Sequence, residues 1–212
     1  MASDVYKRQL LRVAGITKTQ GRPEAALALG QEAIRALEGE AGTRMTVARL
    51  RLLAAAYHDV GGTYSQMGKW QEVIAVREKA LATSTQILAS AEATLDDRLR
   101  EILARTRLGS VLSREQKYDA AARELRRAVE DARRVHRENP QLSQASDTLS
   151  NALMVAGTSE AAQARFENAA GLYAQAYQLR EALRARDPKD WRMRSLAATS
   201  ALRWGLAEVK QG

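Results

Sequence analysis

The sequence predicts an all-α fold in which pairs of antiparallel helices follow one another along the chain. Three observations lead to this prediction. The 212 residues include only three prolines and thirteen glycines, while alanine and arginine are abundant, a composition typical of helices. Apolar residues recur at helical spacing. A short phrase also recurs along the chain, and such self-similarity at a fixed period is the signature of a helical repeat.

The recurring phrase opens the second helix of each repeat. Its last residues stand at positions 26, 73, 121 and 169, so the spacings are 47, 48 and 48. A constant register over four copies sets the architecture of the whole chain. The copies are Gly21-Arg22-Pro23-Glu24-Ala25-Ala26, Gly68-Lys69-Trp70-Gln71-Glu72-Val73, Gln116-Lys117-Tyr118-Asp119-Ala120-Ala121 and Ala164-Arg165-Phe166-Glu167-Asn168-Ala169.

Two columns of small residues keep the same period. One stands twelve residues before the end of each phrase, and the other stands seven residues after it. Small side chains there let the two helices of a repeat approach closely, and stacking of successive pairs then supplies the core. The first column is Ala14, Gly61, Gly109 and Gly157, continued by Gly205, and it follows Val13, Val60, Leu108, Ala156 and Trp204. The second column is Ala33, Ala80, Ala128 and Ala176.

These columns resemble the tetratricopeptide repeat, whose pattern begins W-x2-L-G-x2-Y. The resemblance covers residues 10–210 and implies a right-handed α-solenoid that binds other proteins. In such a solenoid the bulky residues that begin each second helix fill the wedge between repeats. The residues assigned to the repeat core on this basis are Val60, Gly61, Tyr64, Trp70, Leu108, Gly109, Tyr118, Ala121, Gly157, Phe166, Ala169, Trp204 and Gly205.

The repeat boundaries follow from this register. We expect a single solenoid over residues 10–210, with repeats at 10–42, 43–94, 95–140 and 141–188 and a closing helix at 189–210. Residues 1–9 are interpreted as a non-native or disordered leader. The common repeat has about 34 residues, so the longer period predicts helices of roughly 20 residues, about 30 Å each. Helix stops are expected at 39–42, Asn139-Pro140 and Asp187-Pro188, and Asp96 is the expected start of a first helix.

The long period suggests a possible context for the chain. Together with the segment Asp187-Pro188-Lys189-Asp190-Trp191-Arg192, it resembles the arrays found C-terminal to bacterial serine/threonine kinase domains. That resemblance implies a regulatory tail as one alternative, and it carries no kinase residue into this chain. Trp191 is expected to pack against the junction before the closing helix.

No constellation of catalytic residues emerges from the sequence. There are no cysteines, and the two histidines, His58 and His136, belong to no zinc pattern. No glycine-rich phosphate loop follows a strand. We therefore expect no enzymatic activity, no cofactor, no metal and no small-molecule substrate. Neither a secretory signal nor a membrane-spanning segment is evident, so a bacterial, cytoplasmic protein is expected.

In the tetratricopeptide family the first helices line a concave groove, and the resemblance implies the same here. Basic residues outnumber acidic ones at the corresponding positions, which favours an acidic peptide as the partner. The lysines and asparagines of the family's carboxylate clamp are absent, because Leu11/Gly15, His58/Gly62 and Thr106/Ser110 occupy those positions. The groove candidates are Arg12, Lys18, His58, Asp59, Gly62, Ser65, Gln66, Thr106, Arg107, Ser110, Arg114, Asn151, Met154 and Thr158, with Arg203 closing the array.

The net charge of +8 is unevenly distributed. Residues 98–137 carry twelve basic and six acidic side chains, and the densest cluster runs from Arg123 to Arg137. Interleaved carboxylates indicate a solvated helix with many ion pairs. A nucleic-acid-binding repeat that uses this arginine-rich face remains the alternative. The closing helix lacks a second helix, so exposure of Leu202 and Leu206 and self-association through that end are also expected.

Overall fold

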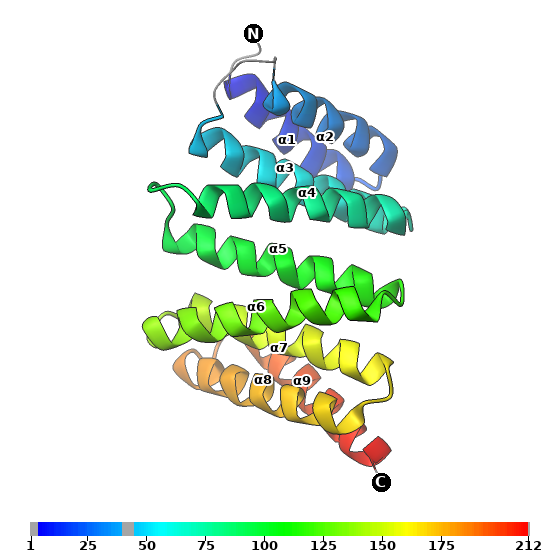
Figure 1. Cartoon of the computed structure of the whole chain (residues 1–212), viewed down its shortest axis with the longest axis vertical. Coiled ribbons are helices and arrows are strands. Elements are labelled where there is room, and N and C mark those ends of the chain that lie inside the picture. Colours follow the sequence, from blue (N-terminus) through cyan, green and yellow to red (C-terminus); the bar gives the residue numbers. More distant parts are fainter. Residues whose placement is uncertain (1–3, 40–44, 212) are drawn as a thin grey trace. The chain divides into compact units, whose positions relative to one another are not determined.

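In the computed structural model, residues 4–39 and 45–211 are described, and they form nine helices and no strand (Figure 1). The predicted all-α helical-repeat fold is confirmed. Helices α3 to α9 each contain 19 to 21 residues, as the long period predicts, while α1 and α2 contain 16. The bounds are α1 Asp4–Thr19, α2 Pro23–Glu38, α3 Val47–Gln66, α4 Trp70–Leu88, α5 Leu95–Arg114, α6 Tyr118–Glu138, α7 Ser143–Ala162, α8 Phe166–Arg186 and α9 Trp191–Gln211.

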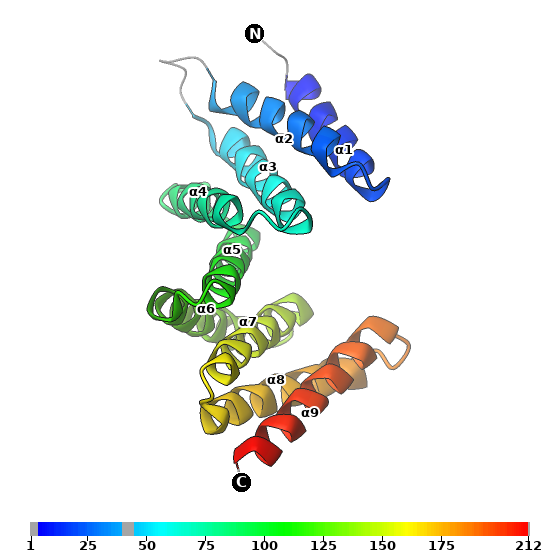
Figure 2. The same cartoon turned by 90° about the vertical axis from the view of Figure 1, so that its right-hand side faces the viewer.

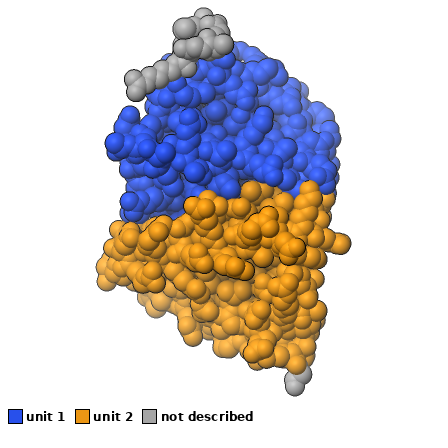
Figure 3. All heavy atoms as spheres, viewed as in Figure 1, with its two compact units in different colours: residues 1–104 blue, residues 105–212 orange. Residues whose placement is uncertain are grey.

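The chain divides into two compact units, and the single solenoid over residues 10–210 stays a prediction. Unit 1 comprises residues 1–104 and unit 2 comprises residues 105–212, so the division falls within α5 (Figure 3). In unit 1, α1 packs on α2, α2 on α3 and α3 on α4. In unit 2, α6 packs on α7, α7 on α8 and α8 on α9 (Figure 2). Within each unit, therefore, helices adjacent in sequence are also adjacent in space.

The turn inside each repeat is the same structure four times. The first residue of each recurring phrase, Gly21, Gly68, Gln116 or Ala164, has a positive φ of 57° to 74°. In each case its amide and the following amide bond back to the end of the first helix, as with Gly68 N to Ser65 O and Lys69 N to Tyr64 O. This is the Schellman ending of a helix, which favours glycine because it requires a left-handed residue. The recurring phrase thus encodes a turn as well as the start of a helix.

The glycine column acts differently from one repeat to the next. A Cβ at Gly109 would lie 2.5 Å from Leu125 Cγ, and one at Gly157 would lie 2.8 Å from Tyr173 Cε1. At Gly61 the nearest atom is Arg77 Cγ at an ordinary 3.7 Å, and around Gly205 there is open space. Close approach of the two helices therefore requires glycine in the third and fourth repeats. Gly205 lies on α9, after which the structure describes no further helix that could make such an approach.

Alanine and branched aliphatic residues make up much of the core of both units. Ala33, Ala128 and Ala176 of the second column have no exposed surface, and Ala80 is 6 % exposed. Val60, Leu108, Ala121 and Ala169 are also buried. The bulky residues that begin the second helices, Trp70, Tyr118 and Phe166, are only partly buried, as are Tyr64 and Trp204.

The helix stops expected at Asn139-Pro140 and Asp187-Pro188 are confirmed, because α6 ends at Glu138 and α8 at Arg186, but the expectations for the leader and for Trp191 are wrong. Helix α1 begins at Asp4, so residues 4–9 are helical rather than a disordered leader, and residues 1–3 lie outside the described part. The stop expected at 39–42 is described only at Gly39, which ends α2 with a φ of 76°. Trp191 is 73 % exposed and does not pack the junction, because it sits at the first turn of α9 with its side chain in solvent.

Candidate functional site

In unit 1, the candidate groove residues lie on α1 and α3. The ammonium of Lys18 on α1 occupies the space beside Gly62 on α3, 2.7 Å from where a Cβ would stand. Glycine at position 62 therefore lets the lysine lie across the neighbouring helix. Lys18, His58, Gly62 and Ser65 are partly exposed, and Arg12, Asp59 and Gln66 are exposed. The structure thus brings Lys18 and Gly62 together, and it leaves basic side chains accessible on these helices.

In unit 2, a second pair of candidates meets between α7 and α9. Arg203 donates from Nη1 to Thr158 Oγ1 over 3.3 Å, and Tyr173 donates its hydroxyl to the same atom at 3.3 Å. Thr158 in turn donates to the carbonyl of Met154. The exposed Thr158 is therefore held by three residues, and Arg203 contributes a guanidinium beside it.

Two candidates are unsuited to contact a partner directly. Thr106 is 1 % exposed and Met154 is 7 % exposed, so both belong to the packed interior. Their spacing places them with the other candidates of α5 and α7, but their side chains are not accessible. Ser110 and Arg114 are exposed, and Arg107 and Asn151 are partly exposed. The accessible candidates of α5 and α7 are therefore Arg107, Ser110, Arg114, Asn151 and Thr158.

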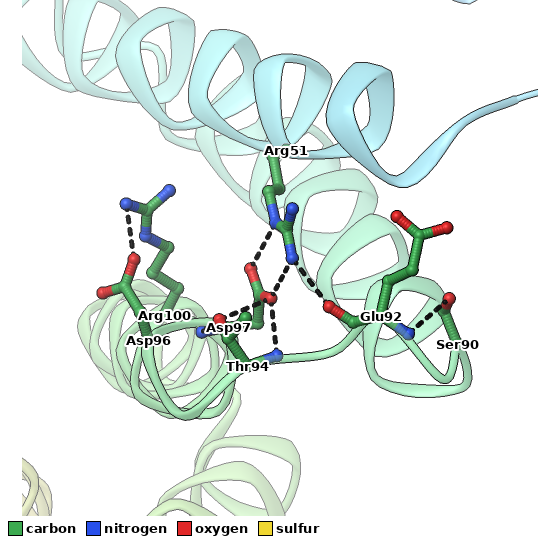
Figure 4. Close-up of polar contacts among 7 residues, drawn as sticks. All are labelled: Arg51, Ser90, Glu92, Thr94, Asp96, Asp97 and Arg100. Atoms are coloured by element: carbon green, nitrogen blue, oxygen red, sulfur yellow. Dashed lines mark hydrogen bonds and ion pairs between the residues drawn. The ribbon is translucent and has the colours of Figure 1, made fainter.

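The start of α5 carries an ion pair that the sequence analysis missed (Figure 4). Arg51 of α3 donates to both carboxylate oxygens of Asp97, from Nε at 3.0 Å and from Nη2 at 2.7 Å, and Nη2 also bonds to the carbonyl of Glu92. Asp97 accepts from the amide and hydroxyl of Thr94, while its own amide donates to Thr94 Oγ1. The Thr94–Asp97 pair is a capping box, and its T-x-x-D spacing was readable in the sequence.

This arrangement changes the electrostatics of Asp97 and corrects the expected start of α5. Asp97 is only 3 % exposed, and its hydrogen bonds with Arg51 hold the pKa of the carboxyl well below its ordinary value of 3.8. Its neighbour Asp96, the expected start residue, is half exposed and instead pairs with Arg100 one turn later. The cap is therefore Thr94 with Asp97, and Asp96 adds only a surface ion pair.

A buried arginine links the two helices of the fourth repeat to the closing helix. Arg180 of α8 is 3 % exposed and donates to Ser150 of α7, and to both the carbonyl of Leu196 and the hydroxyl of Ser200 on α9. Its burial lowers the pKa of the guanidinium from its ordinary value. No sequence signal distinguishes this arginine from the exposed ones nearby, since only the packing of α7 and α9 around it creates its role.

The arginine-rich helix α6 is only partly neutralised. Asp131 pairs with Arg134 at 2.6 Å and lies 3.9 Å from Arg127, and Glu124 pairs with Arg105 of α5. Among the described residues, Arg123, Arg126 and Arg137 have no ion-pair or hydrogen-bond partner, and all three are exposed. The expected network of ion pairs therefore covers only some of the positive charge on this helix.

Among the described residues there is neither a cluster of metal-ligating side chains nor a membrane-spanning helix. Residues 4–39 and 45–211 contain no group of three or more histidine, aspartate or glutamate side chains placed to hold a metal ion. Over the same ranges, no helix is long and apolar enough to cross a membrane.

The fold is similar to that of several solved structures. BtubC from P. vanneervenii matches with a TM-score of 0.72 and 15% identity, over 98% of this chain and 74% of that one. A Podosopora anserina protein with nearly identical TPR-like repeats matches with a TM-score of 0.65 and 16% identity, over 100% and 92% of the two chains. RapI, in its apo form, matches with a TM-score of 0.66 and 10% identity over 99% of this chain, which spans half the length of RapI.

These likenesses show a TPR-type helical repeat fold. No protein-family model and no curated protein sequence matches the chain. At identities of 10% to 16%, the similarity lies in the packing of helix pairs. The resemblance to kinase-associated arrays stays a prediction.

Proposed function

We propose that this chain is a non-enzymatic protein-interaction scaffold whose inner helices bind an acidic peptide or an acidic segment of a partner protein. The observation that carries the proposal is the accessible basic and small side chains on the first helices: Lys18 beside Gly62 in unit 1, and Arg107, Ser110 and Arg114 on α5. The small, exposed Ser110 leaves space for a bound chain, and the cationic side chains favour an anionic partner.

Proteins with the same fold support a binding role. A Rap protein, crystallised in complex with the Competence and Sporulation Factor, matches with a TM-score of 0.61 and 13% identity over 97% of this chain and 56% of its own. Yeast Hif1, described as a scaffold protein that recruits protein complexes to core histones, matches with a TM-score of 0.59 and 13% identity. By analogy of fold, we assign a scaffold role to the present chain.

Charge reversal on α5 tests the acidic-partner proposal. Arg107→Glu with Arg114→Glu is expected to weaken binding to members of a random acidic peptide library by about tenfold or more, because two attractive charges become repulsive. The melting temperature should change little. Fluorescence anisotropy with labelled peptides measures the affinity, and circular dichroism follows melting.

The matched control is Arg127→Glu with Arg134→Glu, which makes the same charge change on α6, away from the candidate groove residues. This control should retain peptide affinity. An equal loss of peptide affinity in both variants would show that the effect depends only on net charge. An unchanged affinity in the α5 variant would contradict the groove proposal.

The arginine-rich face of α6 favours one alternative, nucleic-acid binding. Its support is the three exposed arginines that lack partners among the described residues, Arg123, Arg126 and Arg137. Binding to a nucleic-acid panel at two salt concentrations separates the alternatives, because phosphate contacts give a steep salt dependence. Two other points stay predictions: a kinase-tail context, which the gene upstream would test, and a cytoplasmic location, which cell fractionation would test.

A further inference from the structure

Helix α9 exposes an apolar stripe along its whole length. The stripe consists of Trp191, Ala198, Leu202, Leu206 and Val209, and its four large side chains are between 53 % and 80 % exposed. At about 100° per residue, all five positions lie within about 40° of Leu202 around the helix axis, and no charged residue lies among them. From Trp191 to Val209 the stripe spans about 27 Å, the length of a helix of five turns.

The preceding repeat shows what lies beside the equivalent face of its first helix. Leu202 and Leu206 stand 48 residues after Met154 and Thr158 of α7. Met154 is 7 % exposed, and Thr158 accepts a hydrogen bond from Arg203 of α9. The repeat therefore places another helix beside this face of α7. After α9 the structure describes no further helix, and the equivalent leucines lie in water.

Gly205 leaves open space at one side of the stripe. A Cβ at Gly205 would meet no atom within 4 Å, whereas one at the equivalent Gly157 would lie 2.8 Å from Tyr173 Cε1 of α8. A large side chain of a neighbouring helix thus packs on the glycine in the fourth repeat. Gly205 lies next to Leu202 and Val209, at spacings of three and four residues. The space over Gly205 therefore suits a large apolar side chain of another helix.

Both edges of the stripe are basic. Arg203 and Lys210 lie about 80° to 100° round the helix from Leu202 on one side, and Arg194 lies about 80° from it on the other. All three cations are exposed. Among the residues that the structure describes, none of the three forms an ion pair, so their charge is available to a partner.

The carboxylates nearby do not compensate these cations. Glu208 is the only carboxylate of α9, and it lies about 120° from Leu202 and accepts a hydrogen bond from Trp204 Nε1 at 2.8 Å. On α7, Asp147 already pairs with Arg192, the fourth cation of α9. The face thus combines an apolar centre with positively charged edges.

We propose that this stripe docks an amphipathic helix of a partner protein whose apolar face is bordered by acidic residues. Packing of such a helix on an apolar surface is a recurrent mode of recognition. Its apolar side chains would cover Leu202, Leu206 and Gly205, and its carboxylates would meet the basic edges of the stripe. These edges disfavour a second copy of the chain, because two α9 helices would bring like charges together. The proposal does not depend on the acidic peptide proposed for α5.

Three fluorescein-labelled synthetic peptides of about 21 residues, the length of α9, test the proposal. Two carry leucine at helical spacing and differ only in the residues beside the leucines, which are glutamate in one and lysine in the other. The third is a scrambled form of the glutamate peptide without an apolar face. Fluorescence anisotropy should show that the intact protein binds the glutamate helix about tenfold or more tightly than either of the others.

Substitutions in the stripe test its apolar contribution. Leu202→Ser with Leu206→Ser should weaken binding of the glutamate helix about tenfold or more, because both leucines would lose their apolar contact with it. The melting temperature should change little, since both side chains are exposed. The matched control is Val5→Ser with Ile16→Ser on α1, which removes two comparably exposed apolar side chains and should retain the affinity.

Charge reversal tests the basic edges. Arg194→Glu with Lys210→Glu should invert the preference, so that the lysine helix binds more tightly than the glutamate helix. The same change at Arg123 and Arg137 of α6 is the control and should leave the preference for glutamate in place.

Four results would overturn the proposal. The first is equal affinity of the intact protein for the glutamate helix and its scrambled form, and the second is an equal loss in the α1 control. The third is a dimer in sedimentation that the two leucine substitutions abolish, which would assign the stripe to a second copy. The fourth is binding to phosphatidylserine vesicles without binding to the glutamate helix, which would assign it to a membrane surface. The α5 variant of the groove should bind the glutamate helix normally, so the two proposals fail independently.

Discussion

At the scale of single residues, the polar contacts that hold the helices together come from side chains that look ordinary in the sequence. Arg51 and Arg180 are two of many arginines, yet one pairs with a buried carboxylate and the other bridges α7, α8 and α9. Their roles depend on which helix lies opposite, and composition does not encode that. The capping box is the exception, because Thr94 and Asp97 stand at the spacing that such caps require.

Replacing Asp97 tests this cluster. Asp97→Asn is expected to lower the free energy of unfolding by about 2 kcal/mol, since it removes charged hydrogen bonds and weakens a helix cap. Asp96→Asn is the matched control and should cost only about a few tenths of a kcal/mol, as expected for a surface pair. Urea denaturation of the three proteins provides the comparison, and equal costs for both variants would contradict the assigned role.

The same pair predicts a pH dependence. Because the folded-state pKa of Asp97 is depressed below 3.8, its contribution to stability is complete above about pH 5 and is lost as the pH falls towards the folded-state value. The difference in unfolding free energy between the protein and Asp97→Asn should therefore narrow between about pH 5 and pH 2. A difference that is constant over this range would show that Asp97 is not specifically stabilised as the carboxylate.

At the scale of the helix pair, equivalent positions of the repeats differ in which residue types they tolerate. Two of the four left-handed turn residues, Gln116 and Ala164, are not glycine, so the hydrogen bonds of the turn persist where the residue preference is not met. Likewise the glycine column is sterically required at Gly109 and Gly157 but not at Gly61. A column in the sequence thus marks equivalent positions in the repeats. The distance between the two helices at each position decides whether a residue larger than glycine fits there.

Two alanine substitutions separate these cases. Gly109→Ala should destabilise the protein by about 1–3 kcal/mol, because its Cβ would collide with Leu125. Gly61→Ala should instead stabilise it by about 0.5–1 kcal/mol, because alanine favours a helix and its Cβ has room. Thermal and urea denaturation would measure both. Similar effects of the two substitutions would contradict the distances in the structure.

At the scale of the whole molecule, the chain comprises two compact units and ends its described part with a helix that is covered on one side only. Leu202 and Leu206 of α9 are 64 % and 53 % exposed, as expected for a helix that packs on one neighbour only, and Val209 is 80 % exposed. Self-association through this helix stays a prediction. Because these side chains already lie in water, polar substitutions there should change the stability little.

Lysine substitutions at adjacent positions of α9 probe this one-sided packing. Leu206→Lys should leave the melting temperature nearly unchanged, because the side chain already lies in water. Ala207→Lys should lower it strongly, because Ala207 is 4 % exposed and a buried unpaired charge is costly. Calorimetry would report the melting temperatures, and sedimentation of Leu206→Lys beside the intact protein would show whether this face contributes to self-association.

The sequence by itself determined the helical repeat, its period, the long helices and the alanine-rich core, because small and apolar residues must recur where helices pack against each other. The tertiary structure alone decided which of the predicted groove residues are accessible, for Thr106 and Met154 are buried although their spacing places them with exposed residues. It also decided the Arg51–Asp97 pair and the Arg180 bridge. Each of these joins side chains from different helices, and their meeting depends on how closely and at what angle those helices pack.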